Sequence, residues 1–384
     1  MIQKKILFNI TEDWFFLSHF LSRALSAKKN GFEIYVCCNE TSKKQIIEDY
    51  GINFISLPYK RPNINPIYEI YILIRLILIV SNVKPDIIHN IALKPIIQGS
   101  IASRLLNLKA VVNAPVGMGF VFTSMSFKAR ILKPILTFLL RIFLNSPNGE
   151  KNKKKVIFEN SDDLNYFKKL KAINSNNALV ISGAGVEIDQ TFLKRRRQNK
   201  IPKVVLIARM LKDKGIYEFF EAFQILKNKE IKCQFVLVGD VDPLNPTSLK
   251  RSTLEKWQDE KAIQWLGWID DIQNILLETD ILCLPSYREG LPKSLVEGAA
   301  AGLPLVATDT VGCREVVIEG HNGFLVPIKD SIKLASAIEK LILDSSLRKS
   351  MGRESYKMAI SKFSSSKINT LTLKVYNELC SKAP

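Results

Sequence analysis

The sequence has 384 residues, of which 47% are hydrophobic and 24% charged, so its length suits two domains and its composition excludes an intrinsically disordered chain. The formal net charge is +18, and residues 1–200 carry 30 Lys and Arg against 14 Asp and Glu. Nearly all of the excess charge therefore lies in the first half. That half is expected to meet nucleic acid, an anionic membrane surface or a phosphorylated substrate.

The six cysteines form no CxxC pair and mostly lie in apolar runs, which is typical of core residues in a reducing compartment. The N-terminal residues MIQKKILFNI run directly into a strand pattern, without the apolar region and cleavage site of a signal peptide. A cytoplasmic location is expected.

Strand and helix patterns alternate along the first half of the chain. Strands are predicted at 4–10, 31–38, 53–58, 86–91, 110–115, 155–160 and 178–183. Helices are predicted between them at 13–29, 42–50, 68–86, 94–106, 126–145 and 162–172. Since parallel strands are joined through helices, this order predicts a parallel sheet covered on both faces.

Two of these helices are unusually apolar. The segment 68–86 is interrupted by Arg75, and 126–145 places basic residues among Ile, Leu and Phe, namely Lys128, Arg130, Lys133 and Arg141. Neither offers about 18 uninterrupted apolar residues, so neither is predicted to span a membrane. The pattern of 126–145 favours a membrane-interface helix, with core packing as the alternative, whereas 68–86 favours a core helix. Basic clusters at 149–156 and 193–200 would add attraction to anionic lipid.

The same alternation restarts after a polar, basic linker at 190–200. Strands are predicted at 203–210, 233–240, 262–268 and 281–286, with helices at 215–228, 247–260 and 271–278. We therefore predict two Rossmann-like, doubly wound α/β domains, 1–192 and 200–364, facing a central cleft. Such domains bind ligands at the carboxyl ends of their strands.

The stretch YREGLPKSLVEGAAAGLPLVATD (287–309) places two carboxylates around a predicted helix start. Glu289 lies in the loop before the helix, Pro292 suits its first turn, and Glu297 lies on the helix. Amide groups at a helix start favour phosphate, and carboxylates accept hydrogen bonds from sugar hydroxyls. The stretch therefore suits a sugar–diphosphate–ribose ligand.

This Glu-x7-Glu pattern, followed by AAAGLPLVATDTVGCREVVIEGHNGFLVP, resembles the retaining family-4 glycosyltransferases of the GT-B fold. The resemblance runs from LIARMLKDKG to NGFLVP, and it implies that a C-terminal helix at 367–384 crosses back to join the N-terminal domain. The stretches NITEDWFFLSHFLSRALSAKKNGFEIYVCC and KPDIIHNIALKPIIQGSIASRL resemble, more loosely, bacterial members that extend polyprenyl-diphosphate-linked glycans for capsule, O-antigen or protein glycosylation.

The resemblance implies a role for each matching residue. Arg209 and Lys214 would neutralise the donor diphosphate, Glu289 would contact the transferred sugar, and Glu297 would hold the ribose. Amides around Gly290, Leu291, Lys293, Ser294 and Leu295 would meet the sugar and phosphates. The base pocket would be lined by Gly267, Trp268, Ile269 and Asp270. Without the surrounding motifs, Arg209, Lys214 and Glu297 would each be interpreted as an ordinary surface charge.

The implied mechanism retains the anomeric configuration through front-face attack. It needs no enzyme nucleophile, cofactor or catalytic metal. The paired acids Asp270–Asp271 and Asp162–Asp163 are interpreted as helix caps rather than as metal ligands.

The acceptor side matches the family less closely. His89 is a catalytic candidate, with a structural role as its alternative, because in several family members the important His sits two residues later, where this chain has Ile91. His19 is an acceptor-side candidate that packing would equally explain. Gly117 and Gly119, in PVGMGFVF, form either an acceptor-side loop or a simple turn.

The function predicted is transfer of a sugar from a UDP-hexose or UDP-N-acetylhexosamine to a polyprenyl-diphosphate-linked or other surface-glycan acceptor. The enzyme would act at the inner face of the cytoplasmic membrane, held there by its basic N-terminal domain. A soluble GT-B transferase and a nucleotide-sugar 2-epimerase are the alternatives. A nucleic-acid-binding protein is disfavoured, since the sequence has no DNA- or RNA-binding motif.

Overall fold

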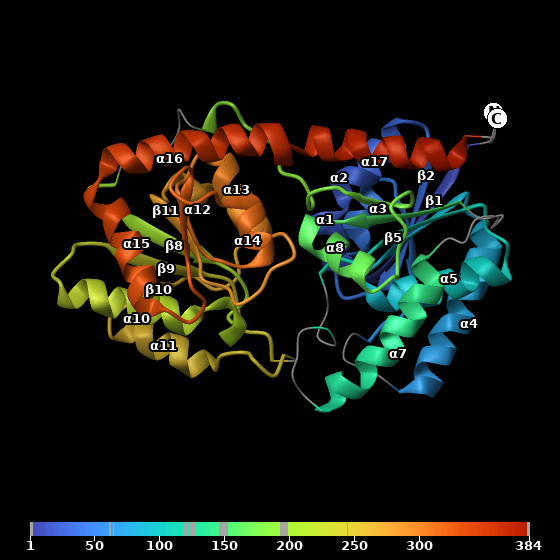
Figure 1. Cartoon of the computed structure of the whole chain (residues 1–384), viewed down its shortest axis with the longest axis horizontal. Helices are drawn as coiled ribbons and strands as arrows, with labels where there is room; N and C mark the ends of the chain where they lie inside the picture. Colours follow the sequence, from blue (N-terminus) through green and yellow to red (C-terminus); the bar gives the residue numbers. More distant parts are fainter. Residues whose placement is uncertain are drawn as a thin grey trace. The chain divides into compact units, whose positions relative to one another are not determined.

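The computed structural model describes residues 3–60, 63, 65–117, 122, 127–145, 153–192, 199–243 and 245–381. The chain forms two compact units (Figure 1). The N-terminal unit comprises Met1–Gly185 and Ser365–Pro384, and the C-terminal unit comprises Val186–Ser364.

A seven-stranded parallel sheet, in the order β3-β2-β1-β4-β5-β6-β7, forms the centre of the N-terminal unit. Its strands are β1 (Lys5–Glu12), β2 (Glu33–Asn39), β3 (Asn53–Ser56), β4 (Ile87–Ile91), β5 (Ala110–Ala114), β6 (Lys153–Phe158) and β7 (Ala178–Val180). Side chains alternate across the sheet, so that Ile6 and Phe8 enter one core cluster and Leu7 enters another. The predicted parallel sheet is confirmed.

Helices cover both faces of this sheet (Figure 1). They are α1 (Asp13–His19), α2 (Leu21–Lys29), α3 (Lys44–Asp49), α4 (Pro66–Val83), α5 (Leu93–Leu105), α7 (Phe127–Leu144), α8 (Ser161–Lys169) and α17 (Ser365–Cys380). The single helix predicted at 13–29 is wrong, because the chain breaks at Phe20, where φ is −124°. The break lets the Phe20 ring pack against His89, with 5.8 Å between ring centroids.

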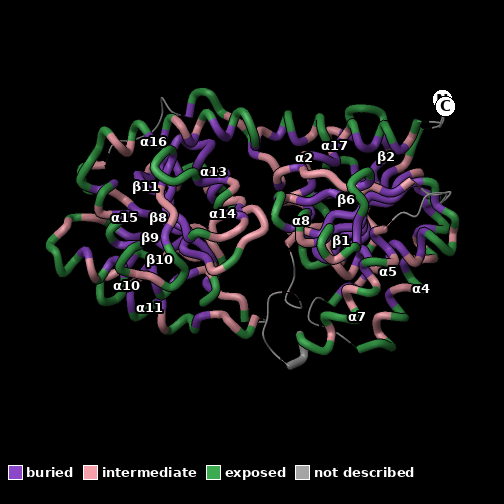
Figure 2. The backbone as a smooth tube through the Cα atoms, in the orientation of Figure 1, coloured by how far each residue is buried: buried purple, intermediate pink, exposed green. Residues whose placement is uncertain are grey.

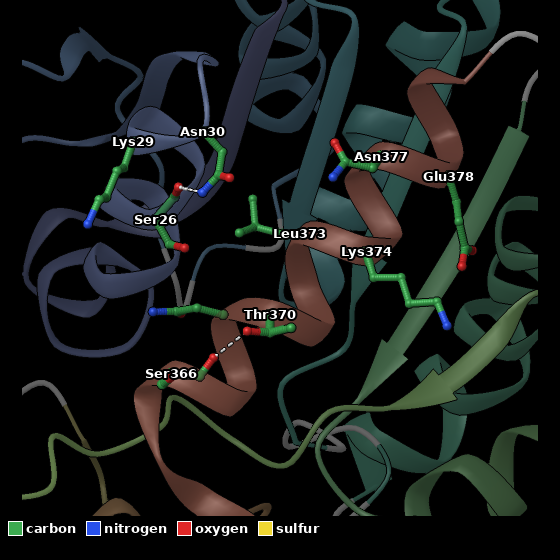
Figure 3. A pocket seen from close by; sticks show the side chains of 10 residues that line it. Ser26, Lys29, Asn30, Ser366, Thr370, Leu373, Lys374, Asn377 and Glu378 are labelled. Carbon is green, nitrogen blue, oxygen red and sulfur yellow. Dashed lines mark hydrogen bonds between the residues drawn. The ribbon is translucent and has the colours of Figure 1, made fainter.

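The last helix, α17, packs against α2 in the N-terminal unit. Its buried residues, among them Ile368, Val375 and Tyr376, join the core cluster of α1 and α2. Figure 3 shows a polar surface hollow between the two helices. Ser26 and Lys29 of α2 and Asn30, the C-cap of α2, line it on one side, and α17 lines it on the other. Residues from the far end of the chain therefore complete the first domain.

The C-terminal unit has a six-stranded parallel sheet in the order β10-β9-β8-β11-β12-β13. Its strands are β8 (Lys203–Ile207), β9 (Gln234–Val238), β10 (Gln264–Trp265), β11 (Ile281–Leu284), β12 (Leu305–Thr308) and β13 (Gly323–Val326). Its helices are η1 (Lys212–Lys214), α10 (Ile216–Asn228), α11 (Arg251–Asp259), α12 (Gln273–Leu277), α13 (Lys293–Ala300), α14 (Val311–Val316), α15 (Ser331–Leu343), α16 (Ser345–Met358) and η2 (Ala359–Phe363).

Helix α4 is apolar on two faces. One face is buried against the sheet and α5, with Ile72, Leu76, Val80 and Val83. The other leaves Ile67, Ile70, Tyr71, Ile74 and Leu78 exposed (Figure 2). Its 18 residues have a mean hydropathy of 1.7 and are only 22% buried, so in length and composition α4 could cross a membrane. Among the described residues it alone passes this test.

Helix α7 also exposes apolar side chains. Ile131, Ile135 and Phe138 lie on its outer face, whereas Leu140 and Leu144 are buried. Both α4 and α7 pack against α5, so they lie on the same side of the sheet (Figure 1). The N-terminal unit thus presents two neighbouring helices with outward apolar residues.

Candidate functional site

The strand order of the C-terminal unit reverses between β8 and β11, its two central strands. In open α/β sheets, ligands bind beyond the carboxyl ends of the strands at such a point. Arg209 and Lys214 follow β8, and Glu289 follows β11. The predicted donor residues therefore lie on the two loops that flank the reversal.

Lys214 and Glu289 form an ion pair with 2.5 Å between Nζ and Oε1. Lys214 ends the 3-10 turn η1, and Gly215 follows with φ of 72°, a left-handed conformation that favours glycine. The two side chains are 22% and 12% exposed, so the pair is screened from bulk water but still reachable. The pair places one positive and one negative group side by side beyond the carboxyl ends of β8 and β11.

Two glycines allow these loops to pack closely. A Cβ on Gly215 would lie 2.1 Å from the carbonyl oxygen of Pro285, and one on Gly312 would lie 2.4 Å from that of Gly290. Gly312 belongs to α14, which follows β12. The loops after β8, β11 and β12 are therefore in backbone contact, which holds Glu289 between its neighbours.

Helix α13 begins beside Glu289 and Gly290, with Pro292 as its N-cap and no side-chain cap. Leu291 precedes it, and Lys293, Ser294 and Leu295 form its first turn, where backbone N–H groups and the helix dipole favour an anion. Leu291 and Leu295 both pack into the apolar core, so only their backbone groups are candidates for ligand contact.

Glu297 lies one turn into α13 and pairs with Lys293 at 3.2 Å. Burial raises the pKa of Glu297, and the charge and hydrogen bond of Lys293 partly oppose this shift. The carboxylate is thus held in a desolvated place where a hydroxyl donor would stabilise it.

Arg209 pairs with Asp242 at 2.6 Å between Nη1 and Oδ2. Asp242 lies in the loop after β9, a neighbour of β8 in the sheet. The predicted strand 203–210 ends at Ile207, so Arg209 lies in the loop rather than in the strand. Asp242 was not predicted as a site residue, and its only signal is its position after a strand of the same sheet.

The stretch predicted to line a base pocket follows β10. Gly267 accepts a hydrogen bond from the N–H of Gly239 at 2.7 Å, and Ile269 packs into the apolar core. Trp268 is 66% exposed, and its Nε1 donates to Asp270 at 2.9 Å. The Trp268 side chain is therefore largely exposed to solvent beside this stretch.

The acid pairs lie at helix starts. Asp271 accepts the N–H of Gln273, the first residue of α12, at 2.9 Å, but the N-cap position is Ile272, so neither Asp270 nor Asp271 is the N-cap residue of α12. The prediction for Asp162–Asp163 is wrong in detail, because Asn160 caps α8 and accepts the N–H of Asp163. In the described part of the chain, no three His, Cys, Asp or Glu side chains group as a metal site requires.

His89 lies inside the N-terminal unit, with no exposed surface. Its Nδ1 is 2.8 Å from the hydroxyl of Tyr376 of α17, and its Nε2 has no hydrogen-bond partner. Burial, aided by the charge of buried Arg23, lowers the pKa of His89 to about 3, so the ring is neutral at physiological pH. This burial favours the structural alternative for His89.

The remaining acceptor-side candidates differ in setting. His19 ends α1, with its Nδ1 2.6 Å from the hydroxyl of Ser18 and its ring 4.4 Å from that of Phe15. Gly117 follows β5 with φ of 70°, and a Cβ there would meet nothing within 4 Å. Gly119 lies outside the described residues.

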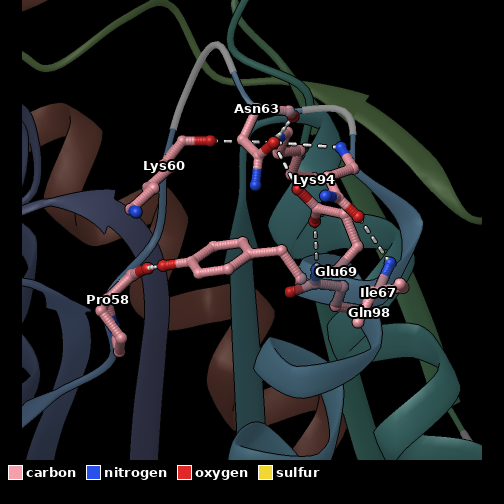
Figure 4. A network of polar contacts seen from close by, with 9 residues as sticks. Pro58, Lys60, Asn63, Ile67, Glu69, Lys94 and Gln98 are labelled. Atoms are coloured by element: carbon pink, nitrogen blue, oxygen red, sulfur yellow. Dashed lines mark hydrogen bonds and ion pairs between the residues drawn. The ribbon is translucent and has the colours of Figure 1, made fainter.

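A polar network joins the loop after β3 to the starts of α4 and α5 (Figure 4). Lys94 donates to the carbonyl oxygens of Lys60, at 2.9 Å, and Asn63, and forms an ion pair with Glu69 at 2.7 Å. Gln98 donates to the other oxygen of Glu69 at 2.7 Å. The network fastens the first turn of α4 to α5, and nothing in the spacing of these residues predicts it.

Comparisons with known proteins agree with this arrangement. Residues 187–358 match the family model described as glycosyl transferases group 1, and residues 5–145 match that described as glycosyl transferase 4-like. The chain is 27% identical to the N,N'-diacetylbacillosaminyl-diphospho-undecaprenol alpha-1,3-N-acetylgalactosaminyltransferase of Campylobacter jejuni, over 88% of this chain and 89% of the relative.

Two further similarities extend over most of the chain. It is 27% identical to the UDP-Gal:alpha-D-GlcNAc-diphosphoundecaprenol alpha-1,3-galactosyltransferase of Escherichia coli, over 82% of this chain and 81% of the relative. The fold is similar to that of Anabaena Alr3699/HepE in complex with UDP, with a TM-score of 0.77 and 18% identity over 97% of this chain and 100% of that one. The predicted GT-B fold is thereby confirmed.

Proposed function

The chain is a glycosyltransferase, with a group 1 domain in its C-terminal half and a 4-like domain in its N-terminal half, and on this premise we propose its substrates. The donor is a UDP-linked hexose or N-acetylhexosamine, and the acceptor is a hydroxyl of a polyprenyl-diphosphate-linked glycan. The observation that carries the donor assignment is the Lys214–Glu289 pair at the strand-order reversal, beside the uncapped start of α13. The two bacterial relatives support the acceptor class.

The proposed reaction retains the anomeric configuration and uses no metal. Arg209 and Lys214 lie on the loop after β8 and would take up the negative charge that develops on the leaving diphosphate. Glu289 would hold hydroxyls of the transferred sugar, and Glu297 those of the ribose. The acceptor hydroxyl would attack on the face from which the diphosphate leaves, and a diphosphate oxygen would take its proton.

A donor screen tests this proposal. Purified protein is supplied with anionic vesicles, a pool of polyprenyl-diphosphate glycans and one nucleotide-sugar at a time, with and without a chelator. UDP release that requires both donor and acceptor, and persists with chelator, is expected. Release of nucleotide from no donor would contradict the proposal, and epimerised or free sugar without acceptor would favour the 2-epimerase alternative.

The raised pKa of Glu297 predicts a pH dependence of donor binding. Only the carboxylate form accepts hydrogen bonds with both oxygens, so UDP affinity falls as the pH drops through this raised pKa. The fall begins at a higher pH than an ordinary glutamate would give. Titration calorimetry with UDP from about pH 5 to about pH 8 measures it.

Glu297→Gln is the matched control, because the β-phosphate of UDP also titrates near pH 6. The variant is expected to bind UDP about tenfold more weakly at neutral pH, since it loses hydrogen bonds to a charged group. The phosphate contribution remains in both proteins. Equal pH slopes in the two would show that Glu297 does not contact the nucleotide.

We propose further that the N-terminal unit holds the enzyme at the inner face of the cytoplasmic membrane through α4 and α7. Their outward apolar side chains are flanked by exposed Arg75 on α4 and by exposed Arg130, Lys133 and Arg141 on α7. Apolar residues framed by cations suit an interface with anionic lipid. The Lys94 network supports this role, because it fixes the start of α4 against α5.

A further inference from the structure

A partly buried hydrogen bond links the loop that carries Glu289 to helix α10, which follows the turn that carries Lys214. The hydroxyl of Tyr287 donates to Oε1 of Glu218 at 2.6 Å. Tyr287 stands two residues before Glu289, and Glu218 lies in the first turn of α10, which begins just after Lys214 and Gly215. The link therefore joins the segments on either side of the Lys214–Glu289 pair.

Backbone contacts reinforce this link. The N–H of Tyr287 donates to the carbonyl oxygen of Asp213 at 2.8 Å, and the hydroxyl of Ser286 donates to the same oxygen at 3.1 Å. Asp213 immediately precedes Lys214. These two hydrogen bonds thus fix the turn that carries Lys214 directly against the loop that holds Glu289.

The surroundings keep this link in one geometry. Glu218 is 9% exposed, and its Oε2 is buried without a hydrogen-bond partner. Among the described residues, the hydroxyl of Tyr287 is therefore the one side chain that donates a hydrogen bond to this carboxylate. Burial, with the hydrogen bond and charge of Glu218, raises the pKa of Tyr287, which stays a donor. Lys329, in the loop after β13, lies 5.1 Å from the centre of the Tyr287 ring.

We propose that Tyr287 and Glu218 are positioning residues for sugar transfer, and that they act by setting where the Lys214 ammonium lies relative to Glu289. The inference rests on the proposed donor site. A small displacement of a group that stabilises the transition state costs more in turnover than in ground-state binding. Loss of the link is therefore expected to lower kcat rather than raise the KM for the donor.

Tyr287→Phe tests this, because it removes only the hydroxyl. We expect kcat of this variant to fall about tenfold, with a nearly unchanged KM for the donor. Glu218→Gln, which keeps an acceptor oxygen for Tyr287, should lose less activity than Glu218→Ala. Tyr217→Phe is the control, since Tyr217 is an exposed tyrosine next to Glu218 whose ring contacts Trp257 instead.

A double variant separates positioning from mere stabilisation. If Tyr287 acts through Lys214, then Tyr287→Phe should have little further effect on kcat in a Lys214→Ala background. Additive losses, or wild-type kcat in Tyr287→Phe, would overturn the inference while leaving the proposed function intact. A wild-type protein that transfers sugar from no donor would instead refute the proposed function. Thermal melting shows whether each variant is folded.

Discussion

Lys214→Ala is expected to lower kcat by about 100- to 1000-fold, with a smaller change in the KM for the donor. The physical reason is that a cation at the leaving diphosphate contributes most when charge has accumulated there, in the transition state. The substitution also removes the partner of Glu289, whose side chain is only 12% exposed. Steady-state kinetics of UDP release, at saturating acceptor, measures the effect.

The control for this experiment lies on the same turn. Lys212 is an exposed lysine two residues earlier in η1, and no ion pair is recorded for it among the described residues. Lys212→Ala should therefore keep wild-type kcat. Equal losses in the two variants would indicate a general charge effect, and full activity of Lys214→Ala would refute its assignment. Since Lys214→Ala leaves Glu289 without its partner, thermal melting must accompany the kinetics.

The second large effect concerns membrane binding. Replacing Ile135 and Phe138 of α7 together by Asp is expected to lower binding to anionic vesicles about 100-fold or more. Each side chain contributes about 1.5–3 kcal/mol when it is buried, and about 1.4 kcal/mol corresponds to a factor of ten. Both are exposed in the protein, Phe138 to 62%, so their replacement should leave the fold unchanged. Co-sedimentation with vesicles measures the partition coefficient.

A residue of the C-terminal unit provides the matched control. Ile332 of α15 is 71% exposed, so Ile332→Asp places one aspartate at an exposed isoleucine away from α4 and α7, as the single variant Ile74→Asp does on α4. It should bind vesicles like the wild type. Ile74→Asp on α4 should weaken binding as the α7 variant does. Undiminished binding of both helix variants, or equal binding to neutral and anionic vesicles, would contradict the proposed surface.

Membrane binding and turnover test different halves of the protein. The α7 variant should keep its activity on a short, soluble acceptor, because Lys214 and Glu289 belong to the other unit. Lys214→Ala should bind vesicles normally. If the α7 variant loses only vesicle binding and Lys214→Ala loses only turnover, then the membrane-binding surface and the catalytic site are separate.

Much of the fold was predictable from local patterns. The alternation of apolar strands and amphipathic helices depends on which residues neighbour one another along the chain, and it implied two parallel sheets. The loops with Lys214 and Glu289 were recognisable because each follows a buried strand. Their ion pair was not, since 75 residues separate them in sequence and their contact depends on β8 and β11 being neighbours.

Two of the details that the sequence did not reveal involve packing between distant segments. At the helix break the ring of Phe20 packs against His89, and His89 in turn contacts the hydroxyl of Tyr376, 287 residues further along the chain. The cap of α8 is a local matter, because Asn160 accepts the N–H of Asp163 three residues later, and Asn is as favourable an N-cap as Asp. Residue type alone did not distinguish Asn160 from the acidic pair after it.

By itself, then, the sequence determined the two-domain α/β architecture and the residues offered at the edge of the second sheet, because periodicity and loop position are local properties. Only the tertiary structure decided which of those residues meet. It paired Lys214 with Glu289 and Arg209 with Asp242, enclosed His89, and turned apolar faces of α4 and α7 outward. The physical reason is that burial and ion pairing are set by strand order and helix packing, which bring together groups far apart in the chain.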